Sequence, residues 1–344
     1  MKHRLKKLQD QVIVITGATS GIGLTTARNA AKRGARLVLA SRSEKTLKQL
    51  TDELSRQGCQ CIHVVADVGK EQDVRKISDA ALKRFDCFDT WINNAGVSIY
   101  GRIEQIPVAD QRQLFETNFW GVVYGSIVAA EHLKQHGGAI INLGSEVSDV
   151  ALPLQGIYSA SKHAVKGFTD SLRLELEQEK APVSVTLIKP AAIDTMFVPH
   201  AKNFMDVEPK LPPPIYAPEL AADAILIAAQ YPKRDIFVGG AAKFFSTAAH
   251  YAPRMVDRFM QSFMFKGQQT DTPVAEHAED ALHEPGTALQ ERREHEGRVL
   301  KSSVYTRAVT HPKMTATIFM AAGLAAIILW QLLRRPSGPR LLGR

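Results

Sequence analysis

The stretch VIVITGATSGIG, residues 12–23, joins a run of β-branched residues to a glycine-rich turn. The run predicts a strand buried on both faces, because parallel strands covered by helices need no polar alternation. Gly17, Gly21 and Gly23 let the turn approach a phosphate closely, and the helix that begins there offers unpaired N–H groups to an anion. The motif by itself also fits a strand-to-helix turn that binds no ligand.

Strands and helices alternate along the rest of the first 240 residues. Apolar runs predict further strands at residues 36–40, 60–66, 88–92, 139–143, 183–188 and 236–238. Amphipathic segments predict helices at residues 44–57, 71–85, 110–134, 157–179 and 217–230. This alternation predicts an α/β fold with a doubly wound parallel sheet, the Rossmann fold, which binds ligands beyond the carboxyl ends of its strands.

Composition and charge limit the classes of partner. The 344-residue chain has 45% hydrophobic and 23% charged residues, which excludes wholesale disorder. Its net charge of +8 resides at the two ends, where basic residues fit anionic lipid headgroups or are simply solvated. The body has no basic stripe with interleaved aromatics, so we expect no nucleic-acid partner. No histidine cluster accompanies Cys59, Cys61 and Cys87, so we expect no metal site and a reducing compartment.

Composition also divides the chain into segments. Residues 1–10 are a basic N-terminal segment, and residues 11–240 are the predicted Rossmann-fold domain. Residues 241–267 are rich in Phe and Met and predict two short helices divided by Pro253. This helical extension packs on the domain, lies on a membrane surface or covers the substrate cleft. Residues 268–313 are polar and acid-rich, and predict a partly disordered linker.

Residues 314–333, MTATIFMAAGLAAIILWQLL, predict one C-terminal transmembrane helix. They carry no charge, and at ~1.5 Å per residue they span the ~30 Å of a bilayer core. Trp330 and the basic tail of residues 334–344 suit the headgroup boundary. The alternative is a buried or dimer-forming Ala-rich helix. The N-terminus lacks the apolar region of a signal peptide, so we expect a single-pass membrane anchor with the catalytic domain on the cytoplasmic side.

Ser145, Tyr158 and Lys162 form a second constellation. Tyr158 and Lys162 are four residues apart, which places a phenol and an ammonium side by side on one helix face. A free Tyr has a pKa of ~10, and a nearby Lys⁺ is expected to lower that pKa and make Tyr158 a general acid/base. Ser145, just past a predicted strand, would hydrogen-bond a substrate oxygen. The Tyr–Lys spacing alone also fits an exposed helix pair.

These motifs, in this order over residues 11–240, resemble the classical short-chain dehydrogenase/reductase family. The resemblance implies a catalytic tetrad of Asn118, Ser145, Tyr158 and Lys162. In it Asn118 holds a water of the proton relay, Ser145 orients the substrate, and Lys162 also binds the nicotinamide ribose. The cofactor-binding residues that the resemblance implies are Thr16, Gly17, Thr19, Ser20, Gly21, Ile22, Gly23, Ser41, Arg42, Asp67, Val68, Asn94, Ala95, Gly96, Tyr158, Lys162, Pro190, Ile193 and Thr195.

One motif departs from the family pattern. The family usually has Pro-Gly after the sixth strand, followed by a Thr that contacts the carboxamide. Here the residues are Pro190-Ala191, then Ile193 and Thr195. Because Ala needs a negative φ more than Gly does, we expect a changed course of the loop over the nicotinamide, with the activity retained.

The choice of cofactor depends on the end of the second strand. An acid there would bind the ribose 2′-OH of NAD and repel a 2′-phosphate. This chain has Ser41-Arg42 instead, and a guanidinium suits bidentate phosphate binding. We therefore expect NADP(H), with NAD(H) as the alternative if Arg42 only stacks on adenine.

The sequence thus predicts an NADP(H)-dependent oxidoreductase that transfers hydride between the nicotinamide and a carbonyl or secondary alcohol. We expect the substrate pocket in residues 146–157, residues 190–218 and the Phe/Met-rich extension, whose apolar character indicates a lipophilic small molecule. The alternatives are an NAD-linked dehydrogenase of a hydroxylated lipid, and a membrane-tethered cofactor-binding scaffold or redox sensor without turnover. Family members are often homodimers or homotetramers, and the resemblance extends that expectation to this chain.

Overall fold

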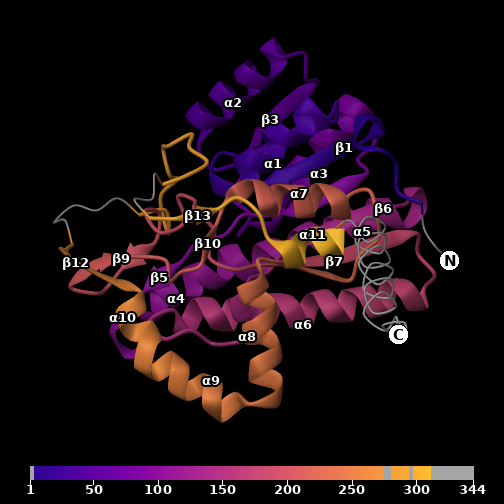
Figure 1. The fold of residues 1–344 in the computed structure, drawn as a ribbon. Helices are drawn as coiled ribbons and strands as arrows, with labels where there is room; N and C mark the ends of the chain where they lie inside the picture. The colour runs from indigo at the N-terminus through magenta and orange to yellow at the C-terminus, as the bar shows by residue number, and fades with distance from the viewer. Residues whose placement is uncertain (1–3, 275–279, 294–296, 311–344) are drawn as a thin grey trace, which may run out of the picture. The chain divides into compact units, whose positions relative to one another are not determined.

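Seven parallel strands form the central sheet of the computed structural model, which describes residues 4–274, 280–293 and 297–310 (Figure 1). Their order is β11-β7-β6-β4-β1-β2-β3, so β1 lies between β2 and β4. Chain order reverses there, which makes the crevice at the carboxyl ends of β1 and β4 the expected ligand site. The strands are β1 Val12–Thr16, β2 Arg36–Ser41, β3 Cys61–Val65, β4 Thr90–Asn93, β6 Gly138–Leu143, β7 Val183–Pro190 and β11 Asp235–Val238.

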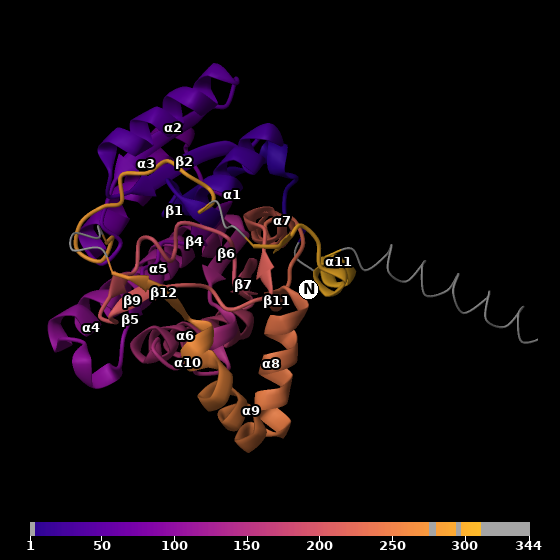
Figure 2. The same cartoon turned by 60° about the vertical axis from the view of Figure 1, so that its left-hand side comes forward.

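Helices cover both faces of this sheet (Figures 1 and 2). α1 and α7 pack against each other on one face, while α3, α5 and α6 lie side by side on the other. The fold predicted from the alternation of strands and helices is therefore confirmed. The helices are α1 Gly21–Lys32, α2 Glu44–Arg56, α3 Glu71–Phe85, α4 Val108–Phe115, α5 Gly121–His136, α6 Gly156–Gln178 and α7 Pro218–Ala228.

The apolar run of β1 is buried along its whole length, and so are β6 and β7. This is the burial expected of central parallel strands with helices on both sides. α2 shows the other pattern: Leu47, Leu50 and Leu54 are buried on one face, and the Ser43 hydroxyl caps the helix by accepting the Thr46 N–H. Periodicity therefore predicted both kinds of element.

The single helix predicted at residues 110–134 is interrupted. α4 ends at Phe115, a π-helical turn spans Glu116–Trp120, and α5 begins at Gly121. A π turn inserts an extra residue without requiring proline, so the sequence carries no breaker to signal it. Asn118 lies in this turn and is fully buried.

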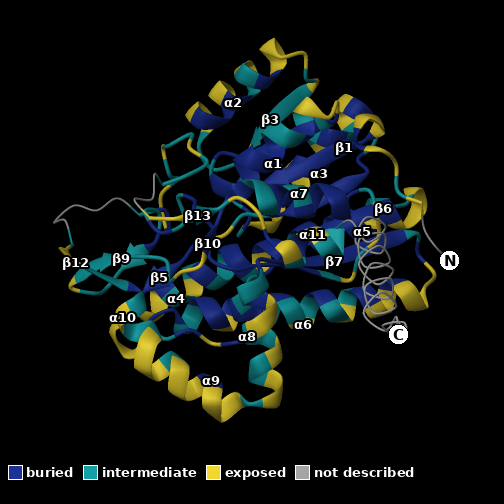
Figure 3. Cartoon of the chain, viewed as in Figure 1, coloured by how far each residue is buried: buried dark blue, intermediate teal, exposed yellow. Residues whose placement is uncertain are grey.

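The Phe/Met-rich extension divides at Pro253 as predicted. Phe245, Met260 and Met264 line a small cavity of the domain. Phe244, Tyr251, Met255 and Phe263 are exposed, and Figure 3 shows exposed stretches along the extension. The extension therefore packs on the domain with one side only. Its elements are α8 Gly240–Tyr251, α9 Pro253–Phe259, a π turn Met260–Met264 and α10 Phe265–Gly267.

Residues 268–293 differ from the linker predicted there. β12 (Gln269–Pro273) pairs antiparallel with β9 (Val207–Pro209), and Leu282 is fully buried. We term residues 280–293 the strap, because backbone groups along it are hydrogen-bonded to Gly21 and Arg42, which follow the carboxyl ends of β1 and β2. Most of these contacts are hydrogen bonds to backbone carbonyl oxygens and ion pairs. Such contacts require no periodic apolar residues in the sequence, so the polar composition indicated a linker.

The described residues up to Thr306 form one compact unit, and a second begins at Arg307. In the first, Lys6 of the basic N-terminal segment lies 2.6 Å from the Asp89 carboxylate. The described part of the second, residues 307–310, is the end of α11 (Val304–Thr310). The transmembrane helix predicted at residues 314–333 and the basic tail lie outside the described residues. No helix within the described ranges has the length and apolarity needed to cross a bilayer.

Candidate active site

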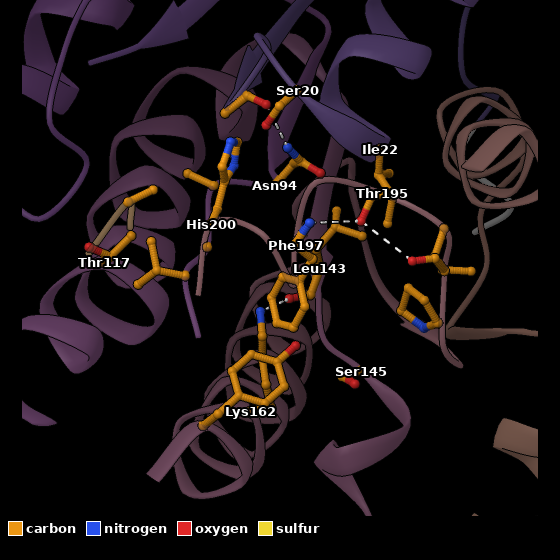
Figure 4. Close-up of a pocket in the computed structure, with 18 of the residues that line it drawn as sticks. Ser20, Ile22, Asn94, Thr117, Leu143, Ser145, Lys162, Thr195, Phe197 and His200 are labelled. Atoms are coloured by element: carbon orange, nitrogen blue, oxygen red, sulfur yellow. Dashed lines mark hydrogen bonds between the residues drawn. The ribbon is translucent and has the colours of Figure 1, made fainter. Parts of the chain in front are cut away.

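A cleft opens at the carboxyl ends of the central strands (Figure 4). Four of the predicted site residues, Thr16, Gly21, Gly23 and Asn118, do not line this cleft. They contact the residues that do, and so support its wall. The predicted site residues that line the cleft are Gly17, Thr19, Ser20, Ile22, Ser41, Arg42, Asp67, Val68, Asn94, Ala95, Gly96, Ser145, Tyr158, Lys162, Pro190, Ile193 and Thr195.

The glycine loop is held at very short range by its neighbours. A Cβ on Gly23 would lie 2.0 Å from the Gly17 carbonyl oxygen, and Gly17 itself has φ +64°. The Asn94 side-chain amide donates to the carbonyl oxygens of Thr16 and Gly17 at 2.9 and 3.0 Å. The Thr16 hydroxyl accepts the Asn94 backbone N–H at 3.0 Å. Asn94, which was predicted to bind the cofactor, thus uses its amide to hold the loop.

Two buried polar atoms of the cleft fit a polar ligand. Ser41 Oγ and Thr117 Oγ1 have no hydrogen-bond partner among the described residues, and both residues line the cleft. Leaving such a group unsatisfied costs about 1–3 kcal/mol, which a ligand rich in hydroxyl and phosphate oxygens would offset. Together with a loop in which an added Cβ at Gly17 or Gly23 would collide, these groups fit a dinucleotide.

Arg42 lines the cleft, but the strap holds its guanidinium. The guanidinium donates to four consecutive backbone carbonyls, those of residues 281–284, at 2.5–3.2 Å. The Gly21 N–H likewise donates to the Gln290 carbonyl oxygen at 3.0 Å. Both groups were expected to be available to cofactor phosphates, whereas protein carbonyl oxygens bind them here. None of the described carboxylates forms an ion pair with Arg42, so its charge is not neutralised.

α6 carries Tyr158 and Lys162 on one face, and both side chains are buried. The Lys162 ammonium donates to the Leu143 carbonyl at 2.8 Å and lies 5.8 Å from the Tyr158 ring centroid (Figure 4). Burial lowers the pKa of Lys162 to about 8. Burial also raises the pKa of Tyr158, while the Ser145 hydroxyl acts in the opposite direction. The lowering of the pKa of Tyr158 that was expected from Lys162 is not found, because burial and then the neighbouring Glu146 charge raise this pKa.

Ser145 and Asn118 occupy well-defined positions around this pair. Ser145 follows β6, and its Oγ accepts the Val147 N–H at 3.3 Å. The Asn118 Oδ1 accepts the Val97 N–H at 2.8 Å, and its Nδ2 donates to Val97 O and to the Ser161 hydroxyl. Asn118 therefore fixes the segment after β4 to α6, one residue before Lys162.

The loop after β7 carries the departure from the family pattern. The Ala191 backbone does not adopt the left-handed conformation, and its N–H donates to the Val238 carbonyl at 2.9 Å. Alanine is therefore accommodated without backbone strain. Further along, Thr195 packs on the start of α1, since a Cβ on Gly21 would lie 3.0 Å from the Thr195 Cβ.

Sequence reasoning did not single out several residues of the cleft. His200, Ala281, Pro285 and Gly286 line it, and the last three belong to the strap. Burial and the neighbouring Arg42 charge lower the pKa of His200, which lies in the loop expected to form the substrate pocket. No sequence signal indicated the strap. Its contacts join residues 281–290 to Gly21 and Arg42, which are far apart in the sequence and meet only in the folded domain.

Comparisons with known proteins agree with this geometry. Residues 11–205 match the family model described as short chain dehydrogenase. The chain belongs to this family. The dehydrogenase is 45% identical over 337 residues to an uncharacterized oxidoreductase, YxnA, of Bacillus subtilis (strain 168), which covers 97% of this chain and 93% of that protein. It is 38% identical over 187 residues to 11-beta-hydroxysteroid dehydrogenase A of Sesamum indicum, but spans only 53% of that relative's length.

Solved structures are similar to the dehydrogenase over most of its length. A short chain dehydrogenase/reductase of Burkholderia phymatum in complex with NAD superimposes with a TM-score of 0.65 and 26% identity, covering 80% of this chain and 100% of that one. A short chain dehydrogenase of Burkholderia cenocepacia J2315 in complex with NADP superimposes with a TM-score of 0.63 and 26% identity, covering 75% of this chain and 100% of that one. The dehydrogenase is accordingly an NAD(P)-dependent oxidoreductase that acts on CH–OH or C=O groups.

Proposed function

We propose that this dehydrogenase uses NADP(H) to interconvert a carbonyl and a secondary alcohol on a lipophilic substrate. The observation that carries the proposal is the placement of Ser145, Tyr158 and Lys162 on the wall of one cleft whose other end holds the glycine loop and Arg42. The nicotinamide, when bound, supplies or accepts the hydride at the substrate carbon.

The protein's own groups would manage the substrate oxygen and its proton. In the reducing direction the Ser145 hydroxyl and the Tyr158 phenol bind the carbonyl oxygen, and the phenol gives its proton to that oxygen. Lys162 stabilises the phenolate that remains, because a pKa of about 8 leaves most of it protonated at neutral pH. Oxidation of the alcohol reverses these steps, with the phenolate accepting the hydroxyl proton. Asn118 acts as a positioning residue through Val97 and Ser161.

The preference for NADP(H) over NAD(H) is supported by the charge at the end of β2. The Arg42 guanidinium lines the cleft without a carboxylate partner among the described residues, next to the unpaired Ser41 hydroxyl. A 2′-phosphate would receive a hydrogen bond from the Ser41 hydroxyl and would be attracted by the positive charge of Arg42, whose Nε–H is the donor that the strap leaves free. The carbonyl oxygens of the strap carry only partial charges, so they hold the guanidinium in place without neutralising it.

A lipophilic substrate is supported by the apolar cavity beside the tetrad. Phe245, Phe259, Met260 and Met264 of the extension line this cavity. The name of the Sesamum indicum relative describes a hydroxysteroid as its substrate, and a steroid is one apolar molecule of this kind. For this chain we extend the proposal only to the class of lipophilic alcohols and ketones.

We further propose that residues 314–333 anchor the dehydrogenase in a membrane with the catalytic domain on the cytoplasmic side, and that it assembles as a homodimer or homotetramer. The uncharged run of MTATIFMAAGLAAIILWQLL supports the anchor. Fractionation of cells that express the full chain, compared with a variant lacking residues 314–344, tests it. Retention of the shortened chain in the membrane fraction would contradict the anchor.

The catalytic proposal is tested by Tyr158→Phe. We expect kcat for NADPH oxidation with lipophilic ketones to fall by roughly 10²–10⁴-fold, the usual contribution of a general acid/base, while NADPH binding is retained. Tyr231→Phe is the control, because Tyr231 is exposed and does not line the cleft. Unchanged turnover in Tyr158→Phe would refute the assigned role. Tight NADPH binding without turnover of any ketone, aldehyde or quinone by the wild type would favour a cofactor-binding scaffold.

A further inference from the structure

Glu146 lies where two cavities meet. It follows Ser145 directly and opens the short 3₁₀ turn Glu146–Ser148 after β6. The residue lines both the cofactor cleft and the smaller cavity between the domain and the Phe/Met-rich extension. The residue after the substrate-orienting serine is thus directed toward the space next to the reacting group.

The smaller cavity is otherwise apolar. Its wall comes from Leu152, Pro213, Phe245, Phe259, Met260 and Met264, with further Val, Ala and Pro side chains. Glu146 is the one residue of this wall that has a polar side chain. An isolated carboxyl in such a place costs free energy unless something hydrogen-bonds to it.

No hydrogen bond or ion pair to the Glu146 side chain occurs among the residues that the structure describes. The two buried lysines of the region are already engaged: Lys162 donates to Leu143 O at 2.8 Å, and Lys189 lies 3.0 Å from the Asp149 carboxylate. No basic residue in the described ranges therefore compensates the carboxyl. Glu146 is only partly buried, so water can hydrogen-bond to the carboxyl in the empty cavity, and a ligand that displaces this water must replace its hydrogen bonds.

The surroundings define the kind of partner. Burial raises the pKa of Glu146 to about 7, so the uncharged carboxyl is well populated at neutral pH. An uncharged carboxyl both donates and accepts a hydrogen bond, which matches a hydroxyl group. The apolar wall around it matches a hydrocarbon skeleton and disfavours a charged ligand.

We propose that Glu146 binds a second hydroxyl group on an otherwise apolar substrate, apart from the oxygen that Ser145 and Tyr158 hold. The inference rests on the proposed function and narrows it: the substrate class becomes lipophilic hydroxy-ketones and the corresponding diols. Glu146 acts as a specificity residue, because a bound substrate without the second hydroxyl displaces water from the half-buried carboxyl and leaves it unpaired.

The test compares methyl octyl ketone with analogues that carry one hydroxyl at successive carbons of the octyl chain. The values of kcat/KM for NADPH oxidation are measured on the full-length wild type, Glu146→Gln and Glu146→Leu. We expect the wild type to prefer at least one hydroxy-ketone over the parent ketone by about tenfold. Glu146→Gln keeps a donor and an acceptor and retains much of this ratio, whereas Glu146→Leu abolishes it.

A control variant separates polarity from shape. Val150→Ala changes the same cavity wall without removing a polar group, so it should leave the ratio between hydroxy-ketone and parent ketone near the wild-type value. Absence of any preference in the wild type, or an equal preference in Glu146→Leu, would overturn the inference. A stronger preference for amino-ketone analogues would also overturn it, because the carboxyl would then bind a cation.

Equilibrium binding distinguishes this failure from failure of the proposed function. Calorimetric titration of the same ketones into the full-length protein with NADP⁺ requires no turnover. Binding that depends on the hydroxyl and on Glu146, without NADPH oxidation, would refute the proposed function and leave the inference standing. Turnover of all ketones without dependence on Glu146 would support the proposed function and refute the inference.

Discussion

The backbone N–H of Gly21 donates to the carbonyl oxygen of Gln290 at 3.0 Å, so the first residue of α1 is bound to the strap. The Arg42 guanidinium is bound to the same segment through four carbonyl oxygens. Both groups lie where the sequence predicts contacts to cofactor phosphates. The strap and the cofactor site therefore share hydrogen-bond donors, and a change in one is expected to be measurable in the other.

Glu291→Ala is expected to loosen the strap. Glu291 pairs with Arg28 of α1 at 2.7 Å, and the two side chains are only partly exposed. Because such pairs contribute up to about 1 kcal/mol, we expect amide hydrogen exchange in residues 281–293 to accelerate by up to about fivefold. Glu53→Ala is the control, since it removes the other partner of Arg28 without touching the strap. Equal rates of amide hydrogen exchange in the two variants would show that the ion pair between Arg28 and Glu291 does not hold the strap.

Arg42→Ala is expected to weaken NADPH binding more than NADH binding. Loss of a charge-assisted contact to the 2′-phosphate should raise the Kd for NADPH by about ten- to a hundredfold, because hydrogen bonds to charged groups contribute about 1.5–3 kcal/mol. The Kd for NADH should change far less. Arg56→Ala on the exposed end of α2 provides a control for net charge. If both Kd values rise equally, Arg42 acts through the strap and not through the phosphate.

Gly23→Ala and Gly167→Ala are expected to act in opposite directions. A Cβ at Gly23 would lie 2.0 Å from a backbone oxygen, so the glycine loop must shift; we expect a loss of at least about 1–3 kcal/mol and weaker NADPH binding. At Gly167, in α6, nothing lies within 4 Å of the added Cβ, so better helix propensity should raise Tm slightly. Calorimetry measures both. A Tm for Gly23→Ala at the wild-type value would refute the close packing.

Glu146→Gln is expected to change how stability depends on pH. The folded pKa of about 7 lies above the unfolded value of 4.5, so the folded protein binds the proton more tightly. The stability from this group is complete below pH 4.5 and is lost as pH rises toward and through 7. We expect the variant's Tm to gain on the wild type across this window, by at least the ~2 °C that 1 kcal/mol produces. Parallel Tm profiles would contradict the burial of an uncharged carboxyl.

Much of the fold and site could be predicted because it depends on neighbours in sequence. The buried run of β1, the helix face of Leu47, Leu50 and Leu54, and the break at Pro253 follow from local patterns of burial and backbone preference. The π turn that holds Asn118 could not be predicted, because no residue in the local sequence signals it and the hydrogen bonds of Asn118 go to Val97 and Ser161, which lie far from it in the chain.

The sequence by itself determined the parallel sheet, the glycine loop, the Ser–Tyr–Lys constellation and the family. These depend on periodicity and on short spacings that survive in a linear chain. Only the tertiary structure decided that Lys162 donates to Leu143, that the strap binds Arg42 and Gly21, and that Glu146 stands unpaired in an apolar wall. The physical reason is that burial and long-range hydrogen bonds arise between segments far apart in the chain. They determine the pKa values of the site residues and which of its hydrogen-bond donors are already engaged.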